Sequence, residues 1–302
     1  MSQSRWTGVV TCRTLDLRAR FGAAFTELAP EITLLTPDEV TDPAAVDFVL
    51  SWVPPKDAFS PYPNLRGIFS IAAGMDAILA CPSLPKNVPV IRVEDPDQAA
   101  QMAGFAAFHI VWHHRQMGLH LENQAKGVWK RPASGRSPAR VRVGVMGFGL
   151  MGRAVALGAR ALGYPVATLS RNLPPKPEAG MAHFTDAHRA AFLARTDILI
   201  NVLPMTPATK GLFDIDLFAA LPVGAAFIHL GRGAQLDESA LLSALETGQI
   251  SGASLDVFAP EPLVAEHPFW SHPKVFVTPH TASEAEPPAV VANVVKHLSA
   301  IG

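Results

Sequence analysis

The sequence predicts an α/β protein built from two doubly wound, mostly parallel sheets, in which helices cover the strands. Its 302 residues are enough for two domains of ordinary size. Short apolar runs alternate with helical patterns, as they do in parallel sheets. This alternation starts a second time at Val141, without an internal sequence repeat.

The first series of strands and helices fills about the first ninety residues. Five apolar runs are typical of short strands: GVVTC, EITLLT, VDFVLSWV, GIFSIAAG and VPVIRV. The amphipathic run LDLRARFGAAFTELA predicts a helix after the first of them, and we expect helices between the others. From Asp97 to Leu121 the pattern is helical throughout and strongly apolar, which predicts one long helix that joins the domains and contributes to a subunit interface.

The second series begins with the buried strand RVRVGVMG, the helix GRAVALGARALG, closed by Gly163, and the strand PVATLS. The runs TDILINVLP, GAAFIHLG, ISGASLDVF and KVFVTPH predict further strands. Between two of them DESALLSALETGQI predicts a helix with Asp237 as N-cap and Gly248 as its stop. A polar loop is expected at 130–140. We expect one domain at 1–96, completed by a C-terminal helix at 282–302, and a second at 97–281.

Composition excludes several classes of partner. Charged residues make up 17% of the chain and the net charge is about −1, so neither nucleic acid nor an anionic membrane is expected as a partner. Cys12 and Cys81 are too few for a disulfide framework and lack metal-ligand spacing, which fits a reducing compartment. No run is long enough to span a membrane or to act as a leader. We expect a cytoplasmic protein.

A glycine pattern opens the second series. In VGVMGFGLMGRAV, Gly147, Gly149 and Gly152 follow a strand and begin a helix, the arrangement that permits a tight turn and lets the backbone approach a pyrophosphate. Leu150 and Met151 would lie in the first helical turn, where free N–H groups attract anions. The alternative is a tight turn between two core elements.

The end of the following strand lacks the carboxylate that normally binds the adenosine ribose. Ser170, Arg171 and Asn172 stand there instead, with Lys176 close behind. A guanidinium binds a phosphate with two parallel hydrogen bonds, whereas a carboxylate would repel it. We therefore expect NADP(H) as the preferred cofactor, with NAD(H) also possible. A solvated surface arginine is the alternative.

Four ionisable residues follow later strands. Arg232 stands in HLGRGAQLD, Asp256 and Glu261 in SLDVFAPEP, and His280 in VTPHTA. Any one of them alone could be an ordinary loop residue. In this order, after the carboxyl ends of strands where open α/β sheets bind ligands, they predict an active site.

Together with LPMTPATKGLFD, these pieces resemble the D-isomer-specific 2-hydroxyacid dehydrogenase family over nearly the whole chain. SIAAGMDAIL and VLSWVPP are similar to its glyoxylate/hydroxypyruvate reductase A branch. The resemblance implies two doubly wound (Rossmann/flavodoxin-like) domains around a cleft, a homodimer, and NADPH-dependent reduction of small 2-oxo acids such as glyoxylate and hydroxypyruvate.

The resemblance also implies residue roles. Arg232 would bind the substrate carboxylate and ketone, His280 would act as general acid, and Glu261 would hold the imidazole and favour its charged form. The implied substrate-binding residues, besides Arg232 and His280, are Trp52, Ala73, Gly74 and Met75. The implied cofactor-binding residues are Gly147, Gly149, Leu150, Met151, Gly152, Ser170, Arg171, Leu203, Pro204, Gly231 and Asp256.

Other possibilities stay open at this point. An enzyme of the same fold could use D-lactate or 3-phosphoglycerate, although only about twenty residues follow His280, too few for a regulatory domain. A nucleotide-sensing binding protein similar to the family's transcriptional corepressors is the alternative of a different class. Gly231 stands where the family usually has alanine or serine, which could loosen the loop carrying Arg232.

Histidines and large apolar residues of the long helix are not assigned to a site. His109 and His113 have i, i+4 spacing but no acidic partner of an HExxH motif, so we expect packing histidines and no metal. His114 should point elsewhere. Core or dimer contact is expected for Met102, Phe105, Phe108 and Trp112.

Overall fold

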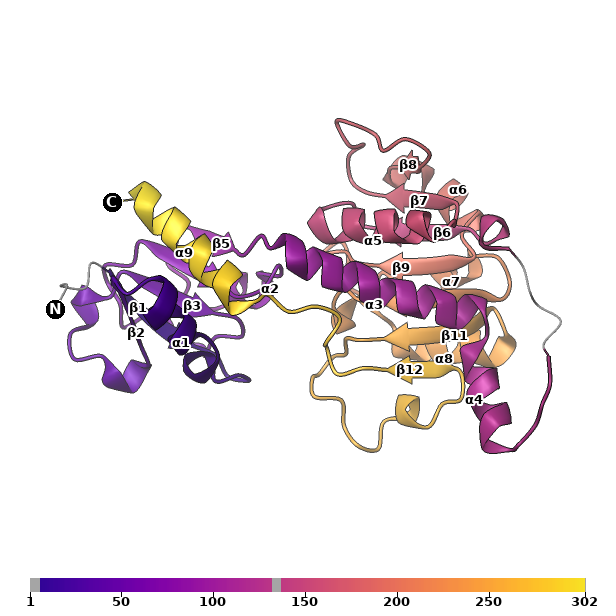
Figure 1. Ribbon diagram of the computed structural model, residues 1–302, viewed down its shortest axis with the longest axis horizontal. Helices are drawn as coiled ribbons and strands as arrows, with labels where there is room; N and C mark the ends of the chain where they lie inside the picture. Colours follow the sequence, from indigo (N-terminus) through magenta and orange to yellow (C-terminus); the bar gives the residue numbers. More distant parts are fainter. Residues whose placement is uncertain (1–5, 132–136, 302) are drawn as a thin grey trace. The chain divides into compact units, whose positions relative to one another are not determined.

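The computed structural model describes residues 6–131 and 137–301, so the expected loop at 130–140 lies partly outside the described residues (Figure 1). The chain divides into two compact units, Met1–Asp97 with Glu284–Gly302 (unit 1) and Gln98–Ser283 (unit 2). Each unit contains one parallel sheet with helices, so the predicted α/β fold is confirmed. Within the described residues no helix has both the length and the apolar character needed to cross a bilayer.

Unit 1 has a five-stranded sheet in the order β2-β1-β3-β4-β5, with every neighbouring pair parallel. The elements of unit 1 are β1 (Trp6–Thr11), α1 (Leu17–Leu28), β2 (Ile32–Leu35), β3 (Phe48–Ser51), β4 (Gly67–Ser70), α2 (Asp76–Leu79), β5 (Val90–Arg92) and α9 (Pro287–Ile301). Helices α1 and α9 pack on each other over a buried core that includes Phe21, Phe25 and Val294.

The expectation that helices separate the strands of unit 1 is only partly right. Two short 3-10 turns, η1 (Pro37–Glu39) and η2 (Pro43–Ala45), follow β2, and the segment 52–66 between β3 and β4 contains no helix. Proline explains this, since it lacks the N–H that a helix interior needs. The prolines of this segment are Pro54, Pro55, Pro61 and Pro63. The segment instead contributes Phe59 and Tyr62 to a second core cluster.

Unit 2 has a seven-stranded parallel sheet in the order β12-β11-β10-β9-β6-β7-β8. Its strands are β6 (Val143–Met146), β7 (Val166–Leu169), β8 (Ala182–Phe184), β9 (Ile198–Asn201), β10 (Ala225–His229), β11 (Ile250–Leu255) and β12 (Val275–Val277). Its helices, counting α3 with this unit, are α3 (Pro96–His114), α4 (Met117–Ala125), α5 (Leu150–Ala161), α6 (Arg189–Ala194), α7 (Ile215–Ala219) and α8 (Glu238–Thr247). The edge strand β8 had no counterpart in the sequence prediction.

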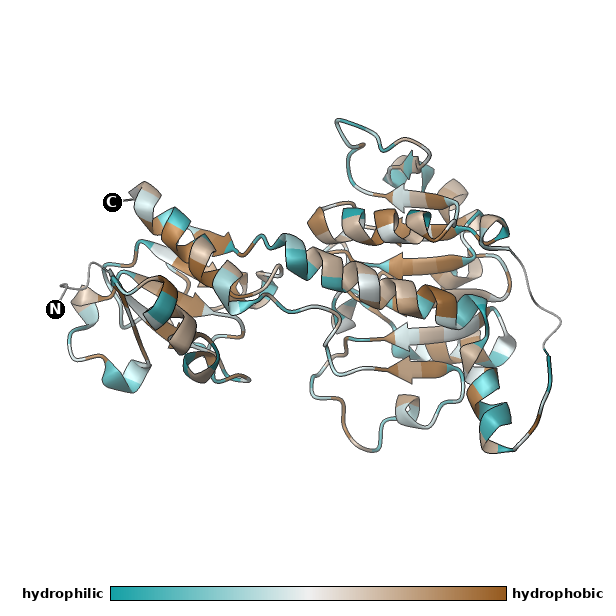
Figure 2. Ribbon diagram, viewed as in Figure 1, coloured by the Kyte–Doolittle hydropathy of each residue, from teal (hydrophilic) through white to brown (hydrophobic). Residues whose placement is uncertain are grey.

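Helices cover both faces of this second sheet. Figure 1 shows α3 and α5 in front of it, where their side chains share a core cluster with β6 and β9. Helices α6, α7 and α8 share another cluster on the opposite face. The strands between the two layers are apolar, as the brown colour along β9 in Figure 2 shows.

The single long helix expected from Asp97 to Leu121 is wrong. The chain breaks between α3 and α4, where Gln116 adopts a left-handed φ of 52°. The end of α3 is anchored by a hydrogen bond of 2.8 Å between His113 Nε2 and Ser254 Oγ, and another of 2.8 Å between His114 Nδ1 and the Tyr164 hydroxyl. The residues at the break are polar, but no glycine or proline stands between His113 and Gln116 to indicate a helix end there.

The predicted ends of helix α8 are confirmed. The Asp237 carboxylate accepts hydrogen bonds from the backbone N–H groups of Ser239 and Ala240. Gly248 ends the helix with a left-handed φ of 79°. Gly163, which follows α5, is also left-handed, with a φ of 88°.

His109 is packed among aromatic rings. Its side chain is 1% exposed, and its ring centroid lies 4.6 Å from that of Phe105 and 5.1 Å from that of Phe276. Burial lowers the pKa of His109 to about 4 from its ordinary 6.5. The folded protein therefore holds this imidazole neutral at pH values where the unfolded chain protonates it.

We expect this burial to make folding stability depend on pH. Between about pH 6.5 and 4 the unfolded state binds one more proton at His109, so the free energy of unfolding falls as the pH is lowered through this window. Replacing His109 with leucine should make that fall shallower by up to about 1.4 kcal/mol per pH unit. Urea unfolding at constant protein concentration, from pH 7 to 4.5, measures it. The matched control is His188→Leu, at an exposed position, and equal slopes for the two variants would contradict the prediction.

Candidate active site

The residues that the sequence predicts for unit 2 all follow the carboxyl ends of its strands. Gly147 comes after β6, Ser170 after β7, Leu203 after β9, Arg232 after β10 and His280 after β12. Because the seven strands are parallel, these ends form one edge of the sheet. The predicted cofactor and catalytic groups of this unit therefore share one side of it.

Glycine suits each of the three positions for a different structural reason. Gly147 has a left-handed φ of 101°, which turns the chain out of β6. A Cβ at Gly152 would lie 2.0 Å from the Gly147 carbonyl oxygen, so only glycine lets helix and loop pack this closely. Gly149 is the N-cap of α5, and a Cβ built there meets nothing within 4 Å. The space in front of the helix terminus suits the close approach of a pyrophosphate.

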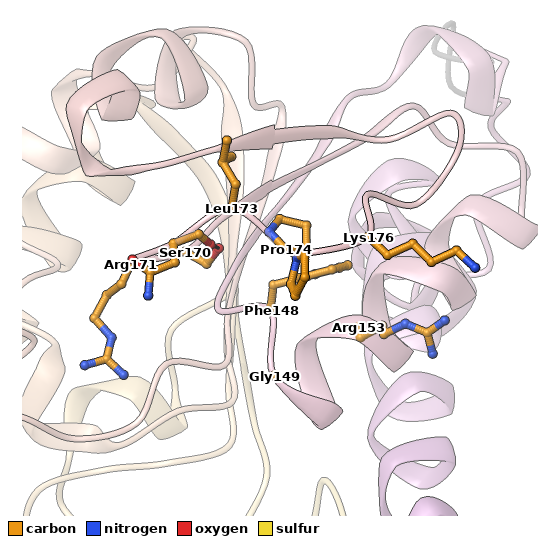
Figure 3. Close-up of a pocket in the computed structure, with 10 residues that line it drawn as sticks. Phe148, Gly149, Arg153, Ser170, Arg171, Leu173, Pro174 and Lys176 are labelled. Atoms are coloured by element: carbon orange, nitrogen blue, oxygen red, sulfur yellow. Dashed lines mark hydrogen bonds between the residues drawn. The ribbon is translucent and has the colours of Figure 1, made fainter.

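A pocket of about 520 Å³ opens beside this loop (Figure 3). Two of its cations are Arg171, the second residue after β7, and Lys176, both exposed. In Figure 3 Arg171 extends to one side of Gly149, while Lys176 and Arg153 lie on the other. The pocket is lined by Phe148, Gly149, Arg153, Ser170, Arg171, Asn172, Leu173, Pro174, Pro175 and Lys176.

Two polar groups of this pocket are already bonded within the protein. The Ser170 hydroxyl donates to the Asn172 carbonyl oxygen at 2.7 Å, and the part of Ser170 in cofactor binding stays a prediction. Arg153 Nε donates to Glu178 Oε1 at 2.7 Å, which ties the loop after β7 to helix α5. Arg171 and Lys176 are the cations best suited to an added phosphate.

His280 and Glu261 lie together. His280 Nδ1 is 2.8 Å from Glu261 Oε2, and both side chains are partly exposed, at 25% and 34%. Burial opposes ionisation of Glu261, but hydrogen bonds from His280 and from the Phe258 N–H, together with the charges of His280 and Arg232, lower its pKa below the ordinary value. A carboxylate therefore faces the imidazole, and the part of His280 in catalysis stays a prediction.

Asp256 holds the loop that carries His280. Its side chain is 1% exposed, and its Oδ1 accepts from the Thr278 hydroxyl at 2.6 Å and from the Thr281 N–H at 2.9 Å. Its Oδ2 accepts from the Ala282 N–H at 3.0 Å. Burial raises the pKa of Asp256, and these hydrogen bonds oppose that rise. The carboxylate thus anchors both sides of His280, whose φ of 56° is left-handed. The implied contact of Asp256 with the cofactor stays a prediction.

Gly231 is closely packed, although its lack of a Cβ suggested a looser loop. A Cβ at this position would lie 2.3 Å from Gln235 Oε1 and 2.5 Å from Asn201 Nδ2. The same Gln235 oxygen accepts a hydrogen bond of 2.9 Å from the Arg232 N–H. Asn201, His229 and Gln235 are fully buried polar residues that the sequence analysis did not single out. Asn201 and His229 had one signal, a polar residue at the end of an apolar strand, in ILIN and AAFIH, whereas Gln235 had none.

Comparison with known proteins identifies relatives of this chain. Residues 107–282 match the family model of the D-isomer specific 2-hydroxyacid dehydrogenase, NAD binding domain. The chain is 40% identical over 266 residues to a glyoxylate/hydroxypyruvate reductase A of Serratia proteamaculans, covering 86% of this chain and 84% of that relative. The chain belongs to the D-isomer-specific 2-hydroxyacid dehydrogenase family. The resemblance seen in the sequence is confirmed.

Two solved structures of this family are similar throughout the chain. A dehydrogenase from Xanthobacter autotrophicus, in complex with NADPH and MES, is 35% identical with a TM-score of 0.91, over 98% of this chain and 94% of that one. A glyoxylate/hydroxypyruvate reductase from Sinorhizobium meliloti, in complex with NADP and sulfate, is 32% identical with a TM-score of 0.91, over 98% and 95%. Both are described as bound to the phosphorylated form of the nucleotide.

The remaining predicted dehydrogenase site residues belong to unit 1. Trp52 follows β3, and Ala73, Gly74 and Met75 follow β4 ahead of α2. The buried Ser70 shapes this second loop, because its Oγ accepts from the Ala72 N–H at 3.2 Å and lies 2.9 Å from the Gly74 carbonyl oxygen. Their part in substrate binding stays a prediction.

Proposed function

We propose that the protein is an NADPH-dependent reductase of small 2-oxo acids, with glyoxylate and hydroxypyruvate as substrates and glycolate and D-glycerate as products. The observation that carries the proposal is the His280–Glu261 hydrogen bond, on the same sheet edge as Arg232 and the glycine loop. Relatives from Serratia proteamaculans and Yersinia enterocolitica, 40% and 36% identical, are named glyoxylate/hydroxypyruvate reductase A, which supports these substrates.

Each residue has a chemical task in this reduction. Bound NADPH supplies the hydride. The Arg232 guanidinium pairs with the substrate carboxylate and, with its remaining donors, polarises the neighbouring ketone. His280 donates a proton from Nε2 as negative charge grows on the ketone oxygen, while Glu261 holds Nδ1 and stabilises the imidazolium. In the same proposal the backbone of Ala73, Gly74 and Met75 binds the carboxylate, and Trp52 limits the size of the substrate.

The activity is tested by NADPH consumption with a panel of 2-oxo acids. His280→Gln should lower kcat by about 10²–10⁴ with a smaller change in KM, because it removes the proton donor. Arg232→Ala should raise KM and lower kcat together. His188→Gln, at an exposed position of the same unit, is the control. Near-normal glyoxylate reduction by both variants would remove the assignment, and a wild-type protein that binds NADPH without oxidising it would be a sensor.

We also propose that Arg171 sets the preference for NADPH. It stands after β7 where a carboxylate would exclude a 2′-phosphate, and no negative residue lines the pocket around it. Charge-assisted hydrogen bonds contribute about 1.5–3 kcal/mol each.

Arg171→Ala should therefore lower kcat/KM for NADPH by about tenfold or more while leaving that for NADH nearly unchanged. Arg189→Ala is the matched control, since Arg189 is a half-exposed arginine of the same unit that pairs with Asp186 outside the pocket. Equal losses with the two nucleotides would show that Arg171 does not contact the phosphate.

We propose that the protein is a homodimer through α3, α4 and the segment that follows. Several large apolar side chains there are exposed, among them Phe108 at 51%, Leu121 at 53% and Trp129 at 97%. Large apolar side chains exposed along one segment of chain favour an interaction site. The cytoplasmic location expected from the sequence stays a prediction.

The double variant Leu121→Glu/Trp129→Glu should shift the mass in light scattering from dimer to monomer, because buried charge opposes association. Val223→Glu, at a valine of unit 2 that is 83% exposed, should leave the dimer intact. A monomeric wild-type protein would contradict the proposal.

A further inference from the structure

We propose that Gln235 is a positioning residue that fixes the Arg232 guanidinium relative to the segment after β9. Gln235 is the third residue of a 3-10 turn, η5 (Gly233–Gln235), whose N-cap is Arg232. The inference rests on the proposed function, in which Arg232 binds the substrate carboxylate. It concerns a residue that touches neither substrate nor cofactor.

The Gln235 side chain is fully buried, and every hydrogen-bonding group of its amide is used. Its Oε1 accepts from the Arg232 N–H at 2.9 Å and from Asn201 Nδ2 at 2.7 Å. Its Nε2 donates to the carbonyl oxygens of Leu203 at 3.2 Å and Pro204 at 3.0 Å. One amide therefore joins the backbone of Arg232 to the two residues that follow the end of β9.

A second buried side chain holds the other side of the Arg232 peptide. His229 Nε2 lies 3.0 Å from the Arg232 carbonyl oxygen, which can only accept, so this nitrogen carries the hydrogen. His229 Nδ1 then accepts from Asn201 Nδ2 at 3.0 Å. Burial lowers the pKa of His229 to about 3, in agreement with a neutral ring that has one donor and one acceptor.

Asn201 completes this buried hydrogen-bond network. Its Oδ1 accepts from the Leu203 N–H at 3.0 Å, which fixes the orientation of its amide and directs the two Nδ2 hydrogens to His229 and Gln235. All three residues are 0% exposed. A buried polar network whose members are all satisfied is rigid, because any displacement leaves a donor or acceptor unpaired away from water.

Because the network bonds the backbone of Arg232, its rigidity fixes the position of that residue. A long arginine side chain can bind a small acid accurately only if its own backbone is fixed, since small errors in position cost large factors in rate. Arg232 Nη1 also donates to the Gly231 carbonyl oxygen at 2.8 Å, so the guanidinium is held back onto the same loop. Gly231 lacks the Cβ that would collide with the Gln235 and Asn201 amides.

The test compares Gln235→Leu with Gln249→Leu. Gln249 is a matched control, because its Nε2 also donates to two carbonyl oxygens of unit 2, those of Phe218 and Leu221, both at 2.9 Å. Both variants should lower the unfolding midpoint. Gln235→Leu alone should raise KM for glyoxylate by about tenfold, the equivalent of one weakened charge-assisted hydrogen bond.

Gly231→Ala keeps the test decisive if Gln235→Leu does not fold, because an unchanged KM for glyoxylate in Gly231→Ala would then overturn the inference. Gly231→Ala removes no polar group but should displace the Gln235 amide and raise KM for glyoxylate in the same way. Where Gln235→Leu folds, the double variant Gly231→Ala/Gln235→Leu should be no worse than the more affected single variant, because the two changes disturb one interaction.

The failures are distinguishable. If the wild-type protein reduces neither acid, the proposed function is lost, and the role of Gln235 with it. If the wild type is active but Gln235→Leu matches Gln249→Leu in KM, or the effects of Gly231→Ala and Gln235→Leu add, the inference alone is overturned.

Discussion

The site depends on the parallel pairing of the strands of unit 2. Parallel strands place all their carboxyl ends on one edge, so residues far apart in the sequence meet there without any further device. Most of unit 2 separates Gly147 from His280 in the sequence. Gly147 nevertheless directly follows β6, and His280 lies three residues after the end of β12. The two edge strands, β8 and β12, are short, and the apolar layers on both faces hold the sheet between them.

In this site the neutral polar groups are buried, whereas the charged groups, with one exception, remain exposed to solvent. Asn201, His229 and Gln235 are fully buried, and they can be, because neutral groups with complete hydrogen bonding tolerate an apolar surrounding. Arg171 and Glu261 keep contact with water, since an isolated buried charge would be far more costly. Asp256 is the exception. Burial raises its pKa, and three hydrogen bonds stabilise its carboxylate inside the protein.

Much of this architecture could be predicted from the sequence because its signals are local. The strands, the caps at Asp237 and Gly248 and the glycine loop each follow from neighbouring residues and were confirmed. The break at Gln116 could not be predicted, because glutamine has no preference for left-handed φ and no glycine or proline stands at 113–116. The helix after GIFSIAAG was predicted and is present as α2, but the helix-free segment before β4 was missed because strand alternation was given more weight than proline.

Gly231 shows where sequence reasoning about a site reaches its limit. Considered alone, a glycine before the substrate arginine predicts a looser loop, and a glutamine three residues after that arginine predicts nothing. In the structure the glycine provides the space that the glutamine amide fills, and that amide bonds the arginine backbone. The rigidity of the loop therefore depends on Gly231 and Gln235 together, because it arises from the contact of the Gln235 side chain with the backbone. The conformational propensity of neither residue alone predicts it. A substitution that is harmless beside a different residue 235 would disturb the site here, because its cost is determined by the neighbour and not by the glycine.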